Sequence, residues 1–407
     1  MNKIKIADPK YRLAFILVTS LFFMWGLSYG LMDVLNKHFQ ETLNVTQGQS
    51  GLVQAAYFGA YFIIAVPAGL FMEKKGYKSG IILGLSLYAV GALLFIPATS
   101  AGSFYFFLFA LFILALGLGC LETAANPYST ALGNPKTAET RLNLSQSFNG
   151  LGQFCGPLIG GLLFFNSSEQ NIGNSNGELA VMTTYVAIAV LVFLLILLFS
   201  KTKLPDLRSN EKELDAISDN KSLFEHKEFI FGVVTQFFYV AAQVGIGAFF
   251  INLMVENWPN STSQQGAFFL SIAMLCLMFG RFISTGLMTK FSPQKMLLIY
   301  AVICSIMMLV AAAGINYISV IAVIITFFFI SIMFPTIFAM GVKNLGSRTK
   351  IGSSYMIMAI VGGAIMPTVM GTIGDKFGTA ISFLLPFLCF IVVFLYALFY
   401  SRLNYRE

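Results

Sequence analysis

Apolar stretches of about 20 residues recur along the whole chain, and this pattern predicts helices that cross a membrane. No stretch shows the alternation of polar and apolar residues over ~10 positions that is typical of a barrel strand. We therefore predict an all-α membrane protein. Its twelve transmembrane helices are expected at residues 12–36, 50–72, 79–98, 104–132, 142–165, 179–200, 228–254, 264–289, 295–314, 318–341, 352–373 and 380–401.

Charged residues are few, and their placement predicts an orientation. Hydrophobic residues make up 57% of the chain and charged residues 11%, whereas a soluble domain carries about 25% charged residues. If both ends of the chain are cytoplasmic, the cytoplasmic segments hold every lysine and arginine except Lys37 and Lys376, as the positive-inside rule requires. The net charge of +7 then reflects membrane orientation, and we expect a lipid bilayer and no nucleic acid as partner.

One long polar segment divides the predicted helices into two sets of six. Residues 201–227 are rich in charged and polar side chains and contain no apolar stretch. We expect a six-helix bundle at residues 1–200, a cytoplasmic linker at 201–227 and a second six-helix bundle at 228–407. Two bundles that rock against each other around a central site are a common architecture of secondary transporters.

Two carboxylates, Asp33 and Glu122, lie inside apolar stretches without a lysine or arginine beside them. An ionisable residue within a membrane helix is costly, and it usually faces a cavity where it has a function. Both acids are therefore candidates for carrying a proton. The alternatives are that Asp33 caps a helix end at the membrane interface and that Glu122 is a satisfied structural acid.

The sequence gives no sign of a cofactor or of an enzyme site. The five cysteines fall within predicted helices, and no CxxC pair or His/Cys cluster indicates a metal. A nucleotide-binding loop and a nucleophile with an adjacent base are likewise missing from the sequence. We expect no cofactor other than a coupling ion, and no enzymatic activity.

Amide side chains form a polar stripe on the fifth predicted helix, where Gln146, Asn149 and Gln153 recur at helical spacing. Asn126 lies one turn after Glu122 and can share its face of the fourth helix. Amides donate and accept hydrogen bonds together, which suits the hydroxyl groups of a sugar. Hydrogen bonding between helices is the alternative for the same side chains.

Two further stripes combine amides with aromatic rings. They lie on the second and the seventh predicted helices and consist of Gln54, Tyr57 and Tyr61 and of Gln236, Tyr239 and Gln243, with Asn252 nearer the outer end of the seventh helix. Aromatic rings beside amides are typical of sugar sites, although packing between helices explains individual tyrosines equally well.

The segment between the second and third predicted helices, GLFMEKKGYK, contains Gly69, Glu73, Lys74, Gly76 and Lys78. This pattern resembles the signature loop of the major facilitator superfamily, in which the loop holds the bundles in one state. The resemblance implies a gating role for Glu73. A similar string, GTIGDKFG, begins at residue 371 and falls on the outer face, as inverted repeats would place it.

Longer strings are similar to the fucose–galactose–glucose:proton symporter family within that superfamily. They are GLGCLETAANP at residues 117–127, RLNLSQSFN at 141–149 and FPTIF at 334–338. The resemblance implies that Glu122 and Asp33 are the protonatable pair and that Gln146 and Asn149 bind the sugar. Tyr29–Met32, Gly247 and Phe334 depart from the residues of fucose-transporting members, and such positions shape the sugar pocket.

We therefore predict a proton-coupled importer of a neutral monosaccharide (an L-fucose-like hexose, glucose, galactose or N-acetylglucosamine). It is expected in a bacterial inner membrane, working as a monomer by alternating access. Sodium coupling, passive sugar transport and multidrug export on the same fold are the alternatives.

Overall fold

The structure, a computed structural model, describes residues 11–133, 138–165, 175–202, 204, 223–288, 290–343, 345 and 349–403. Within these ranges the chain forms helices and no strand. Eleven helical segments among them are long and apolar enough to cross a membrane. Helix α7 (Ala138–Phe164) is also long, at 27 residues, but it carries the polar stripe that contains Gln146 and Asn149.

The chain divides into two compact units. The first consists of Met1–Asn44 and Ala56–Glu211, and the second consists of Val45–Ala55 and Lys212–Glu407. The segment Val45–Ala55 thus groups with the second unit, although the chain before and after it belongs to the first. No pattern in the sequence indicated this grouping.

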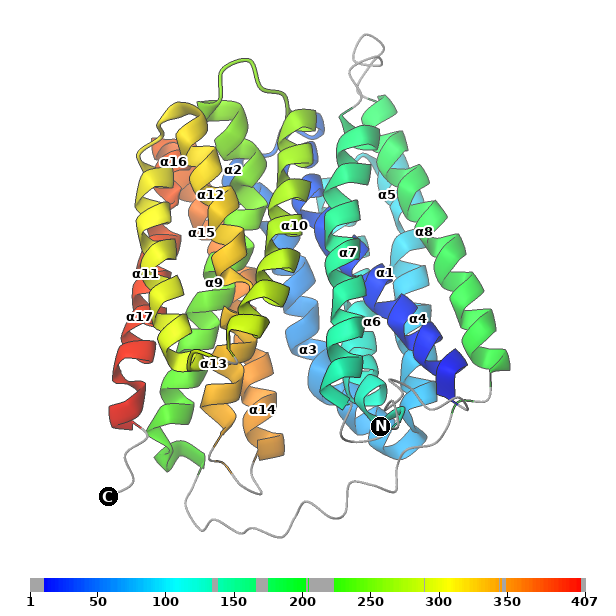
Figure 1. Cartoon of the computed structure of the whole chain (residues 1–407). Helices are drawn as coiled ribbons and strands as arrows, with labels where there is room; N and C mark the ends of the chain where they lie inside the picture. Colours follow the sequence, from blue (N-terminus) through cyan, green and yellow to red (C-terminus); the bar gives the residue numbers. More distant parts are fainter. Residues whose placement is uncertain are drawn as a thin grey trace. The chain divides into compact units, whose positions relative to one another are not determined.

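In the described part of the first unit there are seven helices, and their order follows the chain from blue to green in Figure 1: α1 (Arg12–Thr42), α3 (Leu52–Lys75, whose first residues belong to the second unit), α4 (Tyr77–Leu93), α5 (Phe95–Ala101), α6 (Phe104–Ala131), α7 and α8 (Ser175–Lys201). Helix α1 packs along α7, and α4 packs against α6 and α8.

The contact between α1 and α7 brings the two helix backbones together. A side chain at Gly26 would collide with the Asn149 carbonyl oxygen, and one at Gly152 would collide with the Phe23 carbonyl oxygen. Small residues permit this close approach in membrane helices. The helix that carries Asp33 is thereby fixed against the helix that carries the amide stripe.

The second unit contains α2 (Gln47–Ser50), η5 (Leu223–Glu225), α9 (Lys227–Asn257), α10 (Ser263–Leu287), α11 (Pro293–Ala312), α12 (Asn316–Ile330), α13 (Met333–Val342), α14 (Thr349–Met358), η7 (Ala359–Val361), α15 (Gly362–Phe377), α16 (Thr379–Ser382) and α17 (Leu384–Leu403). Helix α9 is the most enclosed, since α10, α12, α13, α15 and α17 all contact it. The short α2 packs on α15.

The structure divides several predicted spans into consecutive helices. Span 318–341, for example, consists of α12 and α13. Pro335 explains the break, because it has no N–H to donate to the Ser331 carbonyl four residues earlier. The Arg281 Nε donates to that carbonyl instead, at 3.4 Å, and the Tyr239 hydroxyl donates to the neighbouring Ile330 carbonyl at 2.9 Å. Side chains from α9 and α10 therefore satisfy the backbone at the break, as an apolar surrounding requires.

Candidate substrate and proton site

Asp33 lies on α1 and is fully buried. Asn36 and Gln40 follow it at one and two turns on the same helix, and the Gln40 Nε2 donates to the Asn36 Oδ1 at 2.8 Å. Asn36 is also fully buried. Asp33 therefore begins a polar face on α1 that continues toward the end of the helix.

Glu122 lies on α6 and is partly buried. Among the residues that the structure describes, none makes a hydrogen bond or an ion pair with its carboxylate. A carboxylate in apolar surroundings is costly when it is ionised and lacks a counter-charge. Binding a proton is the simplest way to neutralise it.

Aromatic rings from α3 lie near these acids within the first unit. The rings of Tyr57 and Tyr61 are stacked, with centroids 5.2 Å apart and planes at 20°. Tyr57 also meets Tyr29 of α1 edge to face at 6.5 Å. Tyr57 lies within electrostatic range of both Asp33 and Glu122, so three helices converge around its phenol group.

The amides of α7 fall into two groups by their contacts. The Asn149 Nδ2 donates to the Phe22 carbonyl at 3.2 Å, and its Oδ1 accepts from the Gln153 Nε2 at 2.7 Å. Asn149 is therefore engaged in joining α7 to α1. Among the described residues, Gln146 makes one long contact, from its Nε2 to the Asn126 Oδ1 at 3.4 Å, so it retains hydrogen-bonding capacity.

The stripe of the second unit lies on α9 and reaches α13. The Tyr239 ring is 6.4 Å from the Phe334 ring. Gln243 is half-buried, whereas Asn252 is buried near the outer end of α9. Gln236 is fully buried, and neither of its amide atoms finds a hydrogen-bond partner among the described residues.

Gln54 is fully buried on α3 and belongs to the segment Val45–Ala55 of the second unit. No group of three or more His, Cys, Asp or Glu residues within the described ranges is placed to hold a metal ion.

Comparison with known proteins decides the family. The Major Facilitator Superfamily is matched over residues 14–365 of this chain. The chain belongs to the Major Facilitator Superfamily. Superfamily relatives that it resembles along nearly its full length include the L-fucose-proton symporter of Escherichia coli (strain K12), at 39% identity over 96% of this chain and 94% of that protein.

Two further comparisons agree. The glucose/galactose transporter of Brucella abortus biovar 1 (strain 9-941) is 37% identical over 97% of this chain and 96% of that protein. Among solved structures, the superfamily transporter FucP in the outward conformation has a TM-score of 0.70 and 38% identity, covering 96% of this chain and 99% of that one.

The segment that resembles the superfamily's signature loop joins α3 to α4. Gly76 has φ 85° and ψ 161°, a conformation that only glycine adopts readily. Lys78 donates from its Nζ to two carbonyl oxygens at the end of α8, each at 2.9 Å. Lys74 is exposed and Gly69 faces open space, while the Glu73 side chain lies outside the described part of the structure.

Sequence reasoning passed over three polar residues that the structure brings forward. Asn36 and Gln40 continue the face of Asp33 at i+3 and i+7, a spacing that could have been found. Arg281 could not have been singled out, because its role depends on the break between α12 and α13.

Proposed function

We propose that this superfamily member imports a neutral monosaccharide together with a proton by alternating access. The observation that carries the proposal is the Glu122 carboxylate, which has no hydrogen-bond or ion-pair partner among the described residues. It lies one turn before Asn126, which is the contact of Gln146. Proton and sugar sites would then share one face of α6, so that occupancy of one affects the other.

The relatives support the substrate class. One is named an L-fucose-proton symporter and another a glucose/galactose transporter. On this basis we assign Gln146 and Asn126 to the sugar hydroxyls and the Tyr57 and Tyr61 rings to its apolar face. Asn149 then acts by positioning α7 rather than by contacting the sugar.

Residues of the second unit complete the proposed site. Gln243, Tyr239 and Phe334 would face the sugar from α9 and α13, with Asn252 and Gln54 nearer the outer side. Asp33 would carry or relay the proton together with Glu122. The coupling ion would be the only non-protein group required, and sodium is the alternative to the proton.

We further propose the membrane arrangement that the charge distribution indicates. It has twelve spans, α7 among them, in bundles at residues 1–200 and 228–407 with the linker 201–227 and both termini in the cytoplasm. One chain in a bacterial inner membrane would suffice for transport. The signature loop with Glu73 would act in gating on the cytoplasmic side.

Counterflow in proteoliposomes tests the substrate directly, because exchange needs no ion gradient. The panel would contain labelled L-fucose, glucose, galactose, mannose and N-acetylglucosamine. Exchange of one of these sugars is expected, and an imposed pH or sodium gradient would then identify the ion. Failure to exchange any sugar, combined with efflux of a dye, would overturn the proposal in favour of an exporter.

A further inference from the structure

The segment Val45–Ala55 is held on the second unit by a carboxylate at the start of a helix. The Asp375 Oδ1 accepts from the Gln47 backbone N–H and its Oδ2 accepts from the Gly48 N–H, each at 2.9 Å. These N–H groups belong to the first turn of α2, where no carbonyl of the same helix can reach them. A negative charge is stabilising at such a helix start, so Asp375 binds this segment through both hydrogen bonds and charge.

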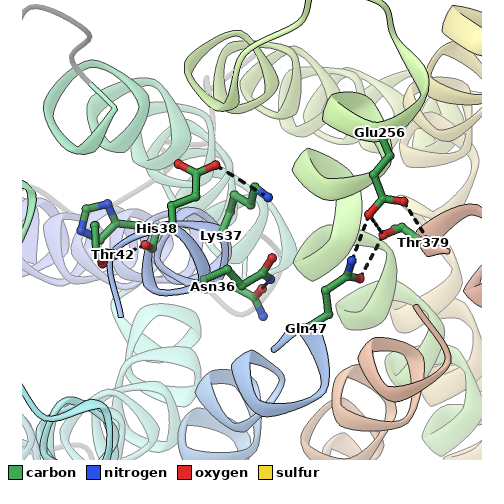
Figure 2. Close-up of polar contacts among 9 residues, drawn as sticks. Asn36, Lys37, His38, Thr42, Gln47, Glu256 and Thr379 are labelled. Carbon is green, nitrogen blue, oxygen red and sulfur yellow. Dashed lines mark hydrogen bonds and ion pairs between the residues drawn. The ribbon is translucent and has the colours of Figure 1, made fainter. Parts of the chain in front are cut away.

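A second carboxylate, Glu256 at the end of α9, holds the side chain of Gln47 (Figure 2). The Glu256 Oε1 accepts from the Gln47 Nε2 at 2.9 Å, and its Oε2 accepts from the Thr379 N–H at 2.9 Å. The Thr379 hydroxyl is within hydrogen-bonding distance of two acceptors, the Glu256 Oε1 and the Gln47 Oε1. Glu256 therefore connects the C-terminal end of α9 with the first residue of α16 and with α2.

Glycines allow α2 and α15 to approach at backbone distance. A Cβ on Gly51 would lie 2.5 Å from the Thr368 nitrogen, and one on Gly371 would lie 2.7 Å from the Gly48 nitrogen. Real Cβ atoms do not approach backbone this closely, so even alanine would separate the two helices. We call these two positions the glycine seam.

The string that contains Asp375 matches the signature loop position by position. Both read Gly-x3-acid-Lys-x-Gly, from Gly69 to Gly76 and from Gly371 to Gly378. The last glycines also share a conformation, with φ 85° and ψ 161° at Gly76 and φ 91° and ψ 148° at Gly378. The same turn therefore occurs twice, and at the second occurrence the acid binds a helix start contributed by the segment Val45–Ala55.

We propose that Asp375, Glu256 and the glycine seam form an outer latch that closes the transporter to the outside and releases whenever it opens outward. The inference rests on the alternating access of the proposed function, because the outer end of the second span must part from the second unit for sugar to enter. The contacts suit release. Asp375 and Glu256 are exposed and Gln47 is half-buried, so water can replace the hydrogen bonds of the two carboxylates at little cost. The glycine seam contains no large side chains that would have to separate.

Labelling of a buried reporter tests the latch without any sugar. Ser50 is fully buried beside the seam, so Ser50→Cys should react slowly with a membrane-impermeant maleimide applied from outside. Adding Gly371→Ala or Asp375→Ala should raise the rate about tenfold, because labelling follows the open population. Gly286→Ala is the matched control, since nothing lies within 4 Å of a Cβ at that position.

Rates in both variants equal to that of the Gly286→Ala control would overturn the latch, even if sugar exchange is confirmed. If Asp375→Ala fails to fold, Asp375→Asn replaces it, because asparagine keeps the size and one acceptor while losing the charge. Its rate should lie between those of the alanine variant and the control. A failed sugar assignment leaves this experiment unaffected.

A cross-link tests whether release is required for transport. A Cβ at Gly48 would lie 2.9 Å from the Thr372 Oγ1, which places the two Cβ atoms within the range of a disulfide. Oxidation of the Gly48→Cys, Thr372→Cys variant should reduce counterflow at least tenfold, and a reductant should restore it. Each single cysteine variant is the control. Unchanged counterflow in the oxidised, cross-linked protein would overturn the proposal.

Discussion

Replacing Glu122 with glutamine removes one ionisable group at almost constant size. Because the carboxylate has no hydrogen bond or ion pair with the described residues, Glu122→Gln breaks no existing contact. The fold and the exchange of sugar should therefore persist. What the variant should lose is the use of a proton gradient, since glutamine cannot carry a proton.

The size of the effect follows from the number of acids that carry protons. One pH unit across the membrane stores about 1.4 kcal/mol per proton, which sustains about a tenfold sugar gradient when one proton accompanies each sugar. If Asp33 and Glu122 each carry one, the limit is about a hundredfold. A lower pH outside than inside drives protons, and the sugar with them, into the vesicle. Glu122→Gln should lower the proton count by one.

The assay is sugar accumulation in proteoliposomes at several pH differences, with the membrane potential clamped to zero. The slope of log accumulation against pH difference gives the proton count. Glu41→Gln, which removes an acid 3.7 Å from Lys37 at the end of α1, is the matched control and should leave the slope unchanged. A Glu122→Gln slope equal to that of the wild type would refute the assignment of Glu122.

Gln146→Ala should reduce counterflow at least tenfold with little change in thermal stability, because its amide makes one long contact within the described part of the chain. Asn149→Ala should instead destabilise the protein by about 1 kcal/mol, since each of its two hydrogen bonds is worth about 0.6 kcal/mol in a membrane protein. Arg281→Ala should destabilise by about 1–3 kcal/mol by leaving the Ser331 carbonyl unpaired. Pro335→Ala restores a backbone donor to that carbonyl, so the double variant should recover most of the loss.

Thermal unfolding in detergent and counterflow, measured on the same preparations, separate these effects. If the Gln146→Ala variant unfolds at a lower temperature but exchanges sugar normally, the roles given to Gln146 and Asn149 would have to be reversed. For Arg281 and Pro335, the coupling between the two substitutions is the decisive quantity. Strictly additive losses would contradict the pairing of Arg281 with the carbonyl.

The helical fold was predictable because a bilayer leaves the backbone few alternatives. The residues at which the helices end were less predictable. The first span was predicted to end at residue 36, before Lys37 and His38, whereas α1 continues to Thr42. Asn36 and Gln40 bond to each other along that last part of the helix. In a sequence, polar residues are taken to mark the point where a helix leaves the membrane. In the structure the helix continues past that point, because its polar side chains can form hydrogen bonds with one another.

The candidate site shows the same limit. Spacing identified the stripe of Gln146 and Asn149, but it could not tell a cavity from a neighbouring helix, and only the Phe22 carbonyl reveals the role of Asn149. The segment Val45–Ala55 is a stronger case, since Gln47 and Glu256 are 209 positions apart. No local pattern encodes a contact over such a separation.

Arg281 has a consequence for the electrostatics of the bilayer. Its guanidinium is anchored within the second unit by the Ser331 carbonyl, and no carboxylate among the described residues forms a salt bridge with it. Like charges repel far more strongly in a medium of low dielectric constant than in water. A positive charge held in a partly buried position repels other cations that come close to it. The Arg281 guanidinium thus adds an electrostatic cost for any second cation placed close to it in the second unit.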